Sequence, residues 1–427
     1  MSYPITVAIA GLGSRGKDTY APLAKKFPDK MKITAIADIV PEKVAEVQRL
    51  YDVPAERCFS SAEEMLKQER LADVMFICTQ DRQHVGHAIP ALEKGYHLVL
   101  EKPISPDDAE CRAILRAAEQ AGRQVIVCHV LRYTPFYNKL KELVDSGVVG
   151  EVVAVQAVEN VGYWHQAHSF VRGNWRNAEQ SSPMILQKCC HDMDILLWLT
   201  GKKCRSVSSV GNTYLFRPEK APAGAALRCL DGCAAKDSCP YDAEKIYITN
   251  PATGVSHGHT GWPCDVLTLH PTVESVTEAL RTGPYGRCVY HCDNTVVDHQ
   301  AVNLDMEDGS VISFLMCGFT SEVSRRTKIM GTKGEIIGEM GQNIITVRPF
   351  GQEPQVIDVS KLTDDFSGHG GGDSRMVEEF LDQLALGSAP SLRTTSLERS
   401  TESHYIAFAA EQSRLQGGAP VLLSSLR

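Results

Sequence analysis

A glycine-rich turn between two short apolar runs constrains this chain more than any other feature of its sequence. Residues 5–10 form the first run, residues 11–16 read Gly-Leu-Gly-Ser-Arg-Gly, and a helix-compatible segment leads to a second run that ends on Asp38. A strand, a glycine turn, a helix and a strand ending on an acid are typical of a dinucleotide-binding βαβ unit. The alternative is a βαβ unit that binds nothing, but the sequence predicts a bound nucleotide.

The three glycines of this turn have different expected roles. Gly11 permits the tight turn, Gly13 lets the backbone approach a pyrophosphate, and Gly16 allows the helix to pack closely on the strand. The helix that follows points its free N–H groups and the positive end of its dipole toward the phosphates.

Asp38 and Arg15 bear on the choice between NAD and NADP. A carboxylate at Asp38 accepts hydrogen bonds from both ribose hydroxyls and repels a 2′-phosphate, so NAD is favoured. Arg15 argues the other way, because a guanidinium there could pair with that phosphate. We therefore expect NAD, with NADP less favoured.

The length, charge and composition of the chain exclude several classes of protein. The 427 residues are enough for two domains, the formal net charge of −8 leaves no basic footprint for nucleic acid, and no apolar run approaches the ~20 residues of a membrane span. The start of the chain leaves no room for a signal peptide, so the 14 cysteines are expected as reduced thiols or metal ligands. We expect a cytoplasmic protein without nucleic-acid or membrane partners.

Strand and helix patterns alternate through residues 1–130. Apolar runs at 72–79, 98–101 and 124–129 follow helix patterns, which indicates a doubly wound parallel sheet. Ligands in such sheets bind at the carboxyl ends of the strands, where His129 also lies. The predicted cofactor-binding residues are Gly11, Gly13, Ser14, Arg15, Gly16, Asp38, Thr79, Glu101 and Lys102.

The pattern changes after about residue 150. Residues 185–199 read as one helix, and residues 375–386 and 396–416 read as closing helices. We predict a Rossmann domain at 1–130 and a second α/β domain at 131–427 with a large, open, mostly antiparallel sheet and a Cys-rich insertion at 217–290. Its expected strands are residues 151–160, 207–215, 296–306, 310–317 and 328–330.

Two side chains stand out as candidates for proton and charge transfer. Lys102 lies in a Glu-Lys-Pro sequence at a strand end, where an ammonium can stabilise a developing alkoxide; a solvated surface lysine is the alternative. His191 can remove a hydroxyl proton near neutral pH, with Asp194 on the same helical face available to orient its ring. A hydrogen-bonded core histidine is the alternative there.

These motifs together resemble the Gfo/Idh/MocA oxidoreductase family: the glycine turn, Glu-Lys-Pro about 90 residues later, and a helical His-x-x-Asp before Trp-Leu. The resemblance covers residues 1–215 and the strands from 296 on. It implies a Rossmann domain, an open-sheet domain that covers the nicotinamide, and hydride transfer between NAD(P) and a sugar or cyclitol hydroxyl. Lys102 would polarise that hydroxyl and His191 would be the acid/base. Gln187 stands where many members have an aspartate, and Lys188 places a cation beside it.

A polar and aromatic segment at residues 163–176 is predicted to form a loop that binds carbohydrate. Aromatic faces stack on sugar rings, and polar side chains satisfy the hydroxyls. The His-Gly-Gly-Gly-Asp sequence at 369–373 is either a helix-capping turn or a substrate contact. The predicted substrate-binding residues are Tyr163, Trp164, His168, Arg172, Trp175, Lys188, Asp194 and His369.

Three cysteines in the insertion, Cys229, Cys233 and Cys239, suggest thiolate ligands of a structural zinc ion. The fourth ligand would come from Cys264, Cys288 or Cys292. Free thiols are the alternative.

Three functions remain open from the sequence. The first is an NAD-dependent oxidoreductase acting on a sugar or cyclitol, as a homodimer or homotetramer. The second is an NAD-dependent glycosidase, which oxidises its substrate transiently and forms no net NADH. The third is a nucleotide-binding regulatory protein without catalysis.

Overall fold

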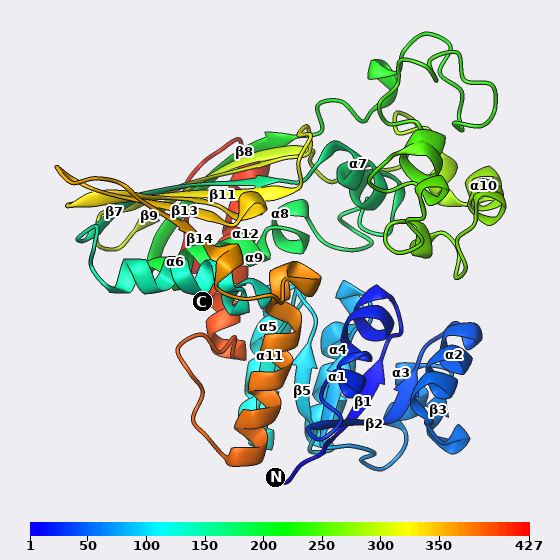
Figure 1. Cartoon of the computed structure of the whole chain (residues 1–427), viewed down its shortest axis with the longest axis horizontal. Coiled ribbons are helices and arrows are strands. Elements are labelled where there is room, and N and C mark those ends of the chain that lie inside the picture. Colours follow the sequence, from blue (N-terminus) through cyan, green and yellow to red (C-terminus); the bar gives the residue numbers. More distant parts are fainter.

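The first part of the chain forms a six-stranded parallel sheet in the order β3-β2-β1-β4-β5-β6. The structure is a computed structural model that describes residues 1–427, apart from the side chain of Ser367. This confirms the predicted doubly wound sheet (Figure 1). Its strands are β1 (Ile5–Ala10), β2 (Met31–Ala37), β3 (Cys58–Phe59), β4 (Val74–Ile77), β5 (His97–Leu100) and β6 (Val125–Val127).

Helices cover both faces of this sheet, which is why its central strands are continuously apolar and buried. The helices begin where the sequence supplies caps: Pro41 occupies the first turn of α2, and the Ser61 hydroxyl accepts from the Glu64 N–H at the start of α3. They are α1 (Leu23–Lys26), α2 (Pro41–Tyr51), α3 (Ala62–Leu66), α4 (His84–Glu93) and α5 (Asp108–Ala121).

The second sheet has nine strands in the order β14-β13-β12-β11-β7-β10-β9-β8-β15 and is antiparallel except between β7 and β10. The mostly antiparallel character is as predicted, and the sequence patterns missed β12 to β15. The strands are β7 (Val152–Asn160), β8 (Cys204–Asn212), β9 (His299–Met306), β10 (Val311–Cys317), β11 (Ser324–Gly331), β12 (Gly334–Glu339), β13 (Ile344–Pro349), β14 (Gln355–Asp358) and β15 (Val421–Leu422).

Helices lie between the two sheets and bury the inner face of the nine-stranded sheet (Figure 1). They are α6 (Pro135–Asp145), α8 (Met184–Gln187), α9 (Cys190–Thr200) and α12 (Leu397–Leu415). The single helix predicted at 185–199 is wrong: Lys188 and Cys189 separate α8 from α9.

The late helix α11 (Ser367–Leu386) packs against the six-stranded sheet, where Met376, Val377 and Phe380 share a core with β1. Residues 368–371 at its start are not helical. The chain after residue 130 therefore contributes to the core around the first sheet as well as the second.

The insertion forms a core of its own at one end of the nine-stranded sheet, together with α7 (Tyr163–His165) and the π-helical segment Gln166–Arg172 (Figure 1). Its one longer helix is α10 (Val273–Thr282). The predicted loop at 163–176 is therefore wrong over most of its length, because these residues are helical and packed against the insertion.

Candidate active site

The glycine turn has the shape that its three glycines predict. Gly11 adopts φ +91°, and a Cβ there would lie 2.5 Å from the carbonyl oxygen of Cys78. A Cβ on Gly16 would lie 1.9 Å from the carbonyl oxygen of Gly11, whereas a Cβ on Gly13 would meet no atom within 4 Å. The first and third glycines are thus fixed by close backbone contacts, and the second borders open space.

Asp38 holds this turn in place from the end of β2. Its Oδ2 accepts from the Leu12 N–H at 2.6 Å, and its Oδ1 accepts from the Val40 N–H at 2.8 Å. At the end of β4, the Thr79 hydroxyl lies 3.1 Å from His87 Nδ1. The carboxylate is therefore fixed beside the glycine turn, where the predicted ribose contact requires it.

Arg15 points from the glycine turn toward the end of β5. Its guanidinium forms ion pairs with Glu101 and Asp373, each at 2.6 Å, and donates to the Tyr20 hydroxyl at 2.5 Å. Burial alone would raise the pKa of Glu101, but Arg15 and Lys102 reverse this and hold it below its usual value. The guanidinium that the sequence offered as a partner for a 2′-phosphate is thus paired with two carboxylates.

Lys102 and His191 come together between the two sheets. The Lys102 ammonium donates to the Gln187 carbonyl oxygen at 3.0 Å. Burial, followed by the charge of Lys102, lowers the pKa of His191 well below its usual value. The imidazole is only 5% exposed, and its Nδ1 has no hydrogen-bond partner among the described residues. The site thus contains a neutral imidazole within reach of an ammonium group.

His369 and His129 lie beside His191. The ring centroids are 5.9 Å apart for His191 and His369, and 5.7 Å apart for His191 and His129. His369 Nδ1 lies 2.9 Å from Asp373 Oδ2, so the non-helical start of α11 links His191 to the Arg15 network. His129 is fully buried, and neither of its ring nitrogens has a hydrogen-bond partner among the described residues.

Asp194 does not orient His191, contrary to the prediction. Its two oxygens accept from the Arg132 guanidinium at 2.7 and 2.6 Å, and the pair is almost completely buried. His191 and Asp194 both lie on α9, three positions apart, but helical spacing could not show that Arg132, from the segment before α6, occupies both oxygens of Asp194.

Lys188 belongs to a charge network that the sequence patterns missed. Its ammonium pairs with Glu159 at 3.0 Å, and Arg325 pairs with both Glu159 and Asp192. Burial and the neighbouring Glu159 raise the pKa of Asp192 to about 6, although Arg325 opposes this. Glu159 is an acid within an otherwise β-prone run, and a buried acid needs a partner, which was the available signal.

The predicted aromatic residues lie in different places. The Trp175 indole N–H donates to Asp81 at 3.2 Å, near the end of β4, and the Tyr163 hydroxyl accepts from Asn250 at 3.3 Å. Trp164 contacts Trp262 of the insertion, with ring centroids 5.0 Å apart. His168 is buried inside the insertion core, with Nδ1 2.8 Å from the Tyr247 hydroxyl.

Arg172 was predicted to bind substrate from a loop. In the structure it is fully buried and lines a pocket of the insertion. Its guanidinium donates to the carbonyl oxygens of Arg287 and Tyr241, both at 2.7 Å, and to Cys229 Sγ at 3.5 Å. Its role is therefore structural, because it joins three segments of the insertion core.

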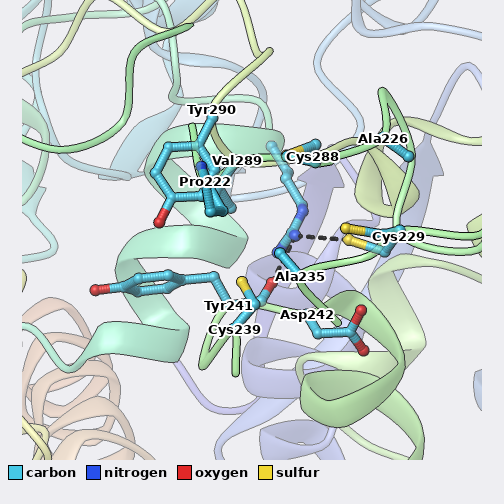
Figure 2. A pocket seen from close by; sticks show the side chains of 13 residues that line it. Pro222, Ala226, Cys229, Ala235, Cys239, Tyr241, Asp242, Cys288, Val289 and Tyr290 are labelled. Carbon is cyan, nitrogen blue, oxygen red and sulfur yellow. Dashed lines mark hydrogen bonds between the residues drawn. The ribbon is translucent and has the colours of Figure 1, made fainter. Parts of the chain in front are cut away.

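The predicted zinc site is not supported. Cys229, Cys233, Cys239 and Cys288 line one pocket (Figure 2), but within the described part of the chain no three His, Cys, Asp or Glu side chains are placed to hold a metal ion. The Arg172 guanidinium already places a positive charge among these thiols, which opposes a second cation. Burial raises the pKa of Cys239, and that of Cys288 to about 11, so both remain thiols.

A Rossmann sheet beside an open sheet, with charged groups between them, is the arrangement expected of an NAD-binding oxidoreductase, and comparison with known proteins shows that class. Residues 5–129 match the NAD-binding Rossmann fold of the Gfo/Idh/MocA oxidoreductases, and residues 141–421 match the C-terminal alpha/beta domain of that family. The chain belongs to the Gfo/Idh/MocA family.

Its similarity to individual members is low. YteT of Bacillus subtilis, which is named as an oxidoreductase, is 23% identical over 91% of this chain and 90% of its own. An inositol 2-dehydrogenase of Corynebacterium glutamicum is 25% identical over 48% of this chain and 57% of its own. An oxidoreductase of Agrobacterium radiobacter, solved with NAD+, L-tartaric acid and magnesium, covers 99% of this chain and 100% of its own at 15% identity and a TM-score of 0.69.

Among the described residues, no helix has the length and apolar character needed to cross a bilayer.

Proposed function

We propose that this protein transfers hydride between a ring hydroxyl of a sugar or cyclitol and NAD. The observation that carries this proposal is the Lys102 ammonium just beyond the end of β5, which donates to the Gln187 carbonyl oxygen and whose charge adds to burial in lowering the pKa of the His191 imidazole. The inositol dehydrogenase among the relatives supports the substrate class.

The residues around the glycine turn fit a dinucleotide. Open space at Gly13 admits a pyrophosphate, the turn leads into the helical segment Ser14–Tyr20, and the Asp38 carboxylate is fixed beside the turn. NAD is preferred to NADP, because Arg15 is committed to Glu101 and Asp373. When bound, the nicotinamide supplies the hydride acceptor or donor.

His191 and Lys102 divide the remaining work between them. The low pKa of His191 keeps its imidazole neutral, so it can accept the proton of the hydroxyl being oxidised. The Gln187 carbonyl oxygen positions Lys102. The ammonium of Lys102 then donates a hydrogen bond to the oxygen of the substrate hydroxyl and stabilises the negative charge that develops there. In the reducing direction His191 returns the proton, and Lys102 again stabilises the charge on the reacting oxygen.

A glycosidase that oxidises its substrate transiently is the second candidate. The exposed indole of Trp262 beside Trp164 favours it, since such rings can bind the group that is released. One measurement separates the two: stoichiometric NADH indicates the dehydrogenase, and glycoside cleavage without net NADH indicates the glycosidase. The third candidate, a regulatory protein, is disfavoured by the presence of both Lys102 and His191.

A thermal-shift screen with NAD and NADP, each combined with sugars, cyclitols and glycosides, tests the proposal. Ligands that bind the folded state raise its unfolding temperature. We expect NAD to do so alone and a true substrate to add to it. The proposal fails if no nucleotide shifts the transition.

The outer face of the nine-stranded sheet supports a homodimer or homotetramer. Val153, Val311 and Leu315 on β7 and β10 are 50%, 52% and 42% exposed. Side chains of this kind on a broad sheet face are typical of an interface between copies. Light scattering of the purified protein tests the oligomeric state.

We expect the protein to lie in the cytoplasm, because its 14 cysteines are free thiols.

A further inference from the structure

One residue of the insertion, Trp262, lies against the helical segment that borders the candidate active site. Its indole contacts Trp164, His165 and His168, with ring centroids 5.0, 4.9 and 5.4 Å apart. It is nevertheless 40% exposed, while the next two residues, Pro263 and Cys264, are buried. The ring is thus supported by other rings and still open to solvent.

The position of this ring is fixed by the insertion core. The Cys264 thiol donates to the carbonyl oxygens of Tyr247 and Thr253 at 3.4 and 3.3 Å, and the Cys264 N–H donates to the Gly261 carbonyl oxygen at 2.8 Å. Tyr247 in turn holds His168. A rigid aromatic surface costs little conformational entropy when a ligand covers it.

His165 connects this surface to the candidate active site. His165 lies on α7, just after β7, and Glu159 near the end of β7 pairs with Lys188 at 3.0 Å, next to the Gln187 carbonyl oxygen that accepts from Lys102. The charges of Lys188 and Lys102 accordingly add to burial in lowering the pKa of His165. Two residues beyond the buried Pro263, burial and the neighbouring Asp18 raise the pKa of Asp265 to about 6, against the effect of Lys17. The stretch around Trp262 therefore also reaches the segment that follows the glycine turn.

We propose that Trp262, Trp164 and His165 form a second sugar-binding subsite, which makes the substrate a disaccharide or glycoside. This rests on the proposed function, in which the ring being oxidised is held at Lys102 and His191. The indole then packs on the apolar face of the neighbouring sugar ring, and the rings of Trp164 and His165 support the indole. An insertion that supplies the ring for this subsite explains why it is anchored against the segment Gln166–Arg172.

The test compares single and paired sugars on the NAD-loaded full-length protein. Glucose, galactose and mannose are measured beside cellobiose, lactose and mannobiose, with wild type, Trp262→Ala and Trp262→Phe. For the accepted disaccharide we expect Trp262→Ala to raise KM about tenfold with kcat little changed, and Trp262→Phe to fall between the two. KM for the corresponding monosaccharide stays as in wild type.

Phe350→Ala is the matched control, because Phe350 is also an exposed aromatic residue, 64% exposed, but lies just beyond the end of β13. It should leave both KM values unchanged. Equal losses for monosaccharide and disaccharide in Trp262→Ala, or no loss for either, overturn the subsite.

Calorimetric binding of the same sugars separates this inference from the proposed function. Disaccharide binding that weakens in Trp262→Ala, with neither NADH formed nor glycoside cleaved, supports the subsite and refutes the hydride-transfer proposal. Hydride transfer from wild type that prefers monosaccharides, with Trp262→Ala unchanged, supports the proposed function and refutes the subsite.

Discussion

The candidate active site contains a partly buried arginine and the insertion a fully buried one, and their positive charges have different partners. Arg15 lies between two carboxylates, Glu101 and Asp373. Arg172 is fully buried, yet its guanidinium donates to two backbone carbonyl oxygens and one thiol. The first is part of a network of charges in the candidate active site, and the second joins segments of the insertion core. Residue type and local sequence alone do not distinguish these roles.

The largest loss of activity is expected from a substitution in the candidate active site. Lys102→Ala should lower kcat/KM about 10³-fold, because it removes the ammonium that stabilises the developing alkoxide. NAD should still raise the unfolding temperature, since the glycine turn is intact. Lys139→Ala, a change in an ion pair on the outside of α6, is the control and should leave kcat/KM unchanged. Normal turnover in Lys102→Ala would exclude the assigned role.

His191 should produce the next largest effect and a distinctive pH profile. His191→Ala should lower kcat/KM for oxidation about 10²- to 10³-fold. In wild type, a base must be unprotonated to act, and the pKa of His191 lies well below its usual 6.5. The oxidation rate should therefore hold its plateau as the pH falls through 6.5 and decline only at lower pH. A half-maximal rate at or above pH 6.5 contradicts this.

Substitution of Arg15 and substitution of Arg172 should lower the free energy of unfolding by different amounts. Arg15→Met leaves Glu101 and Asp373 unpaired, which we expect to lower the free energy of unfolding by about 2–3 kcal/mol after allowing for the partial exposure of Arg15. Arg172→Met leaves no carboxylate without its partner and should cost about 1–2 kcal/mol. Urea unfolding of both variants measures the difference, and an equal or reversed order breaks the comparison.

Removal of metal ions should have the smallest effect on stability. Dialysis against EDTA should shift the unfolding temperature by less than about 1 °C, and Cys233→Ser should behave as wild type does, because the thiol pocket already holds the Arg172 guanidinium. Elemental analysis should find less than about 0.1 zinc ion per chain. A stoichiometric metal, lost together with stability, would restore the site expected from the cysteine spacing.

The same two regions show how far the sequence could be interpreted. The strands and glycines around β1 and β2 were predictable because the turn, the packing and the acid at Asp38 are all local consequences of nearby residues. The position of Lys102 just beyond the end of a strand could also be predicted, and its catalytic role stays a prediction. These signals depend on residues close together in the sequence.

The errors lie where distant segments meet. Asp194 was assigned to His191 from helical spacing, but its partner, Arg132, lies 62 residues away, before α6. The cysteines were interpreted as zinc ligands from their spacing. Their spacing could not show that Arg172, 57 residues before Cys229 in the sequence, lies among them and donates to Cys229. The pairing of Glu159 with Arg325 depends on β7 and β11 lying side by side, which no local pattern predicts.

The central claim is that Lys102 and His191 serve a hydride transfer to bound nucleotide, and following the transferred atom tests it most directly. The sugar that the binding screen selects is prepared with deuterium on its reacting ring carbon and mixed with the NAD-loaded protein in a single turnover. The account predicts absorbance at 340 nm that rises more slowly than with the unlabelled sugar, and deuterium on C4 of the nicotinamide. Product formed without any such absorbance or label would contradict it.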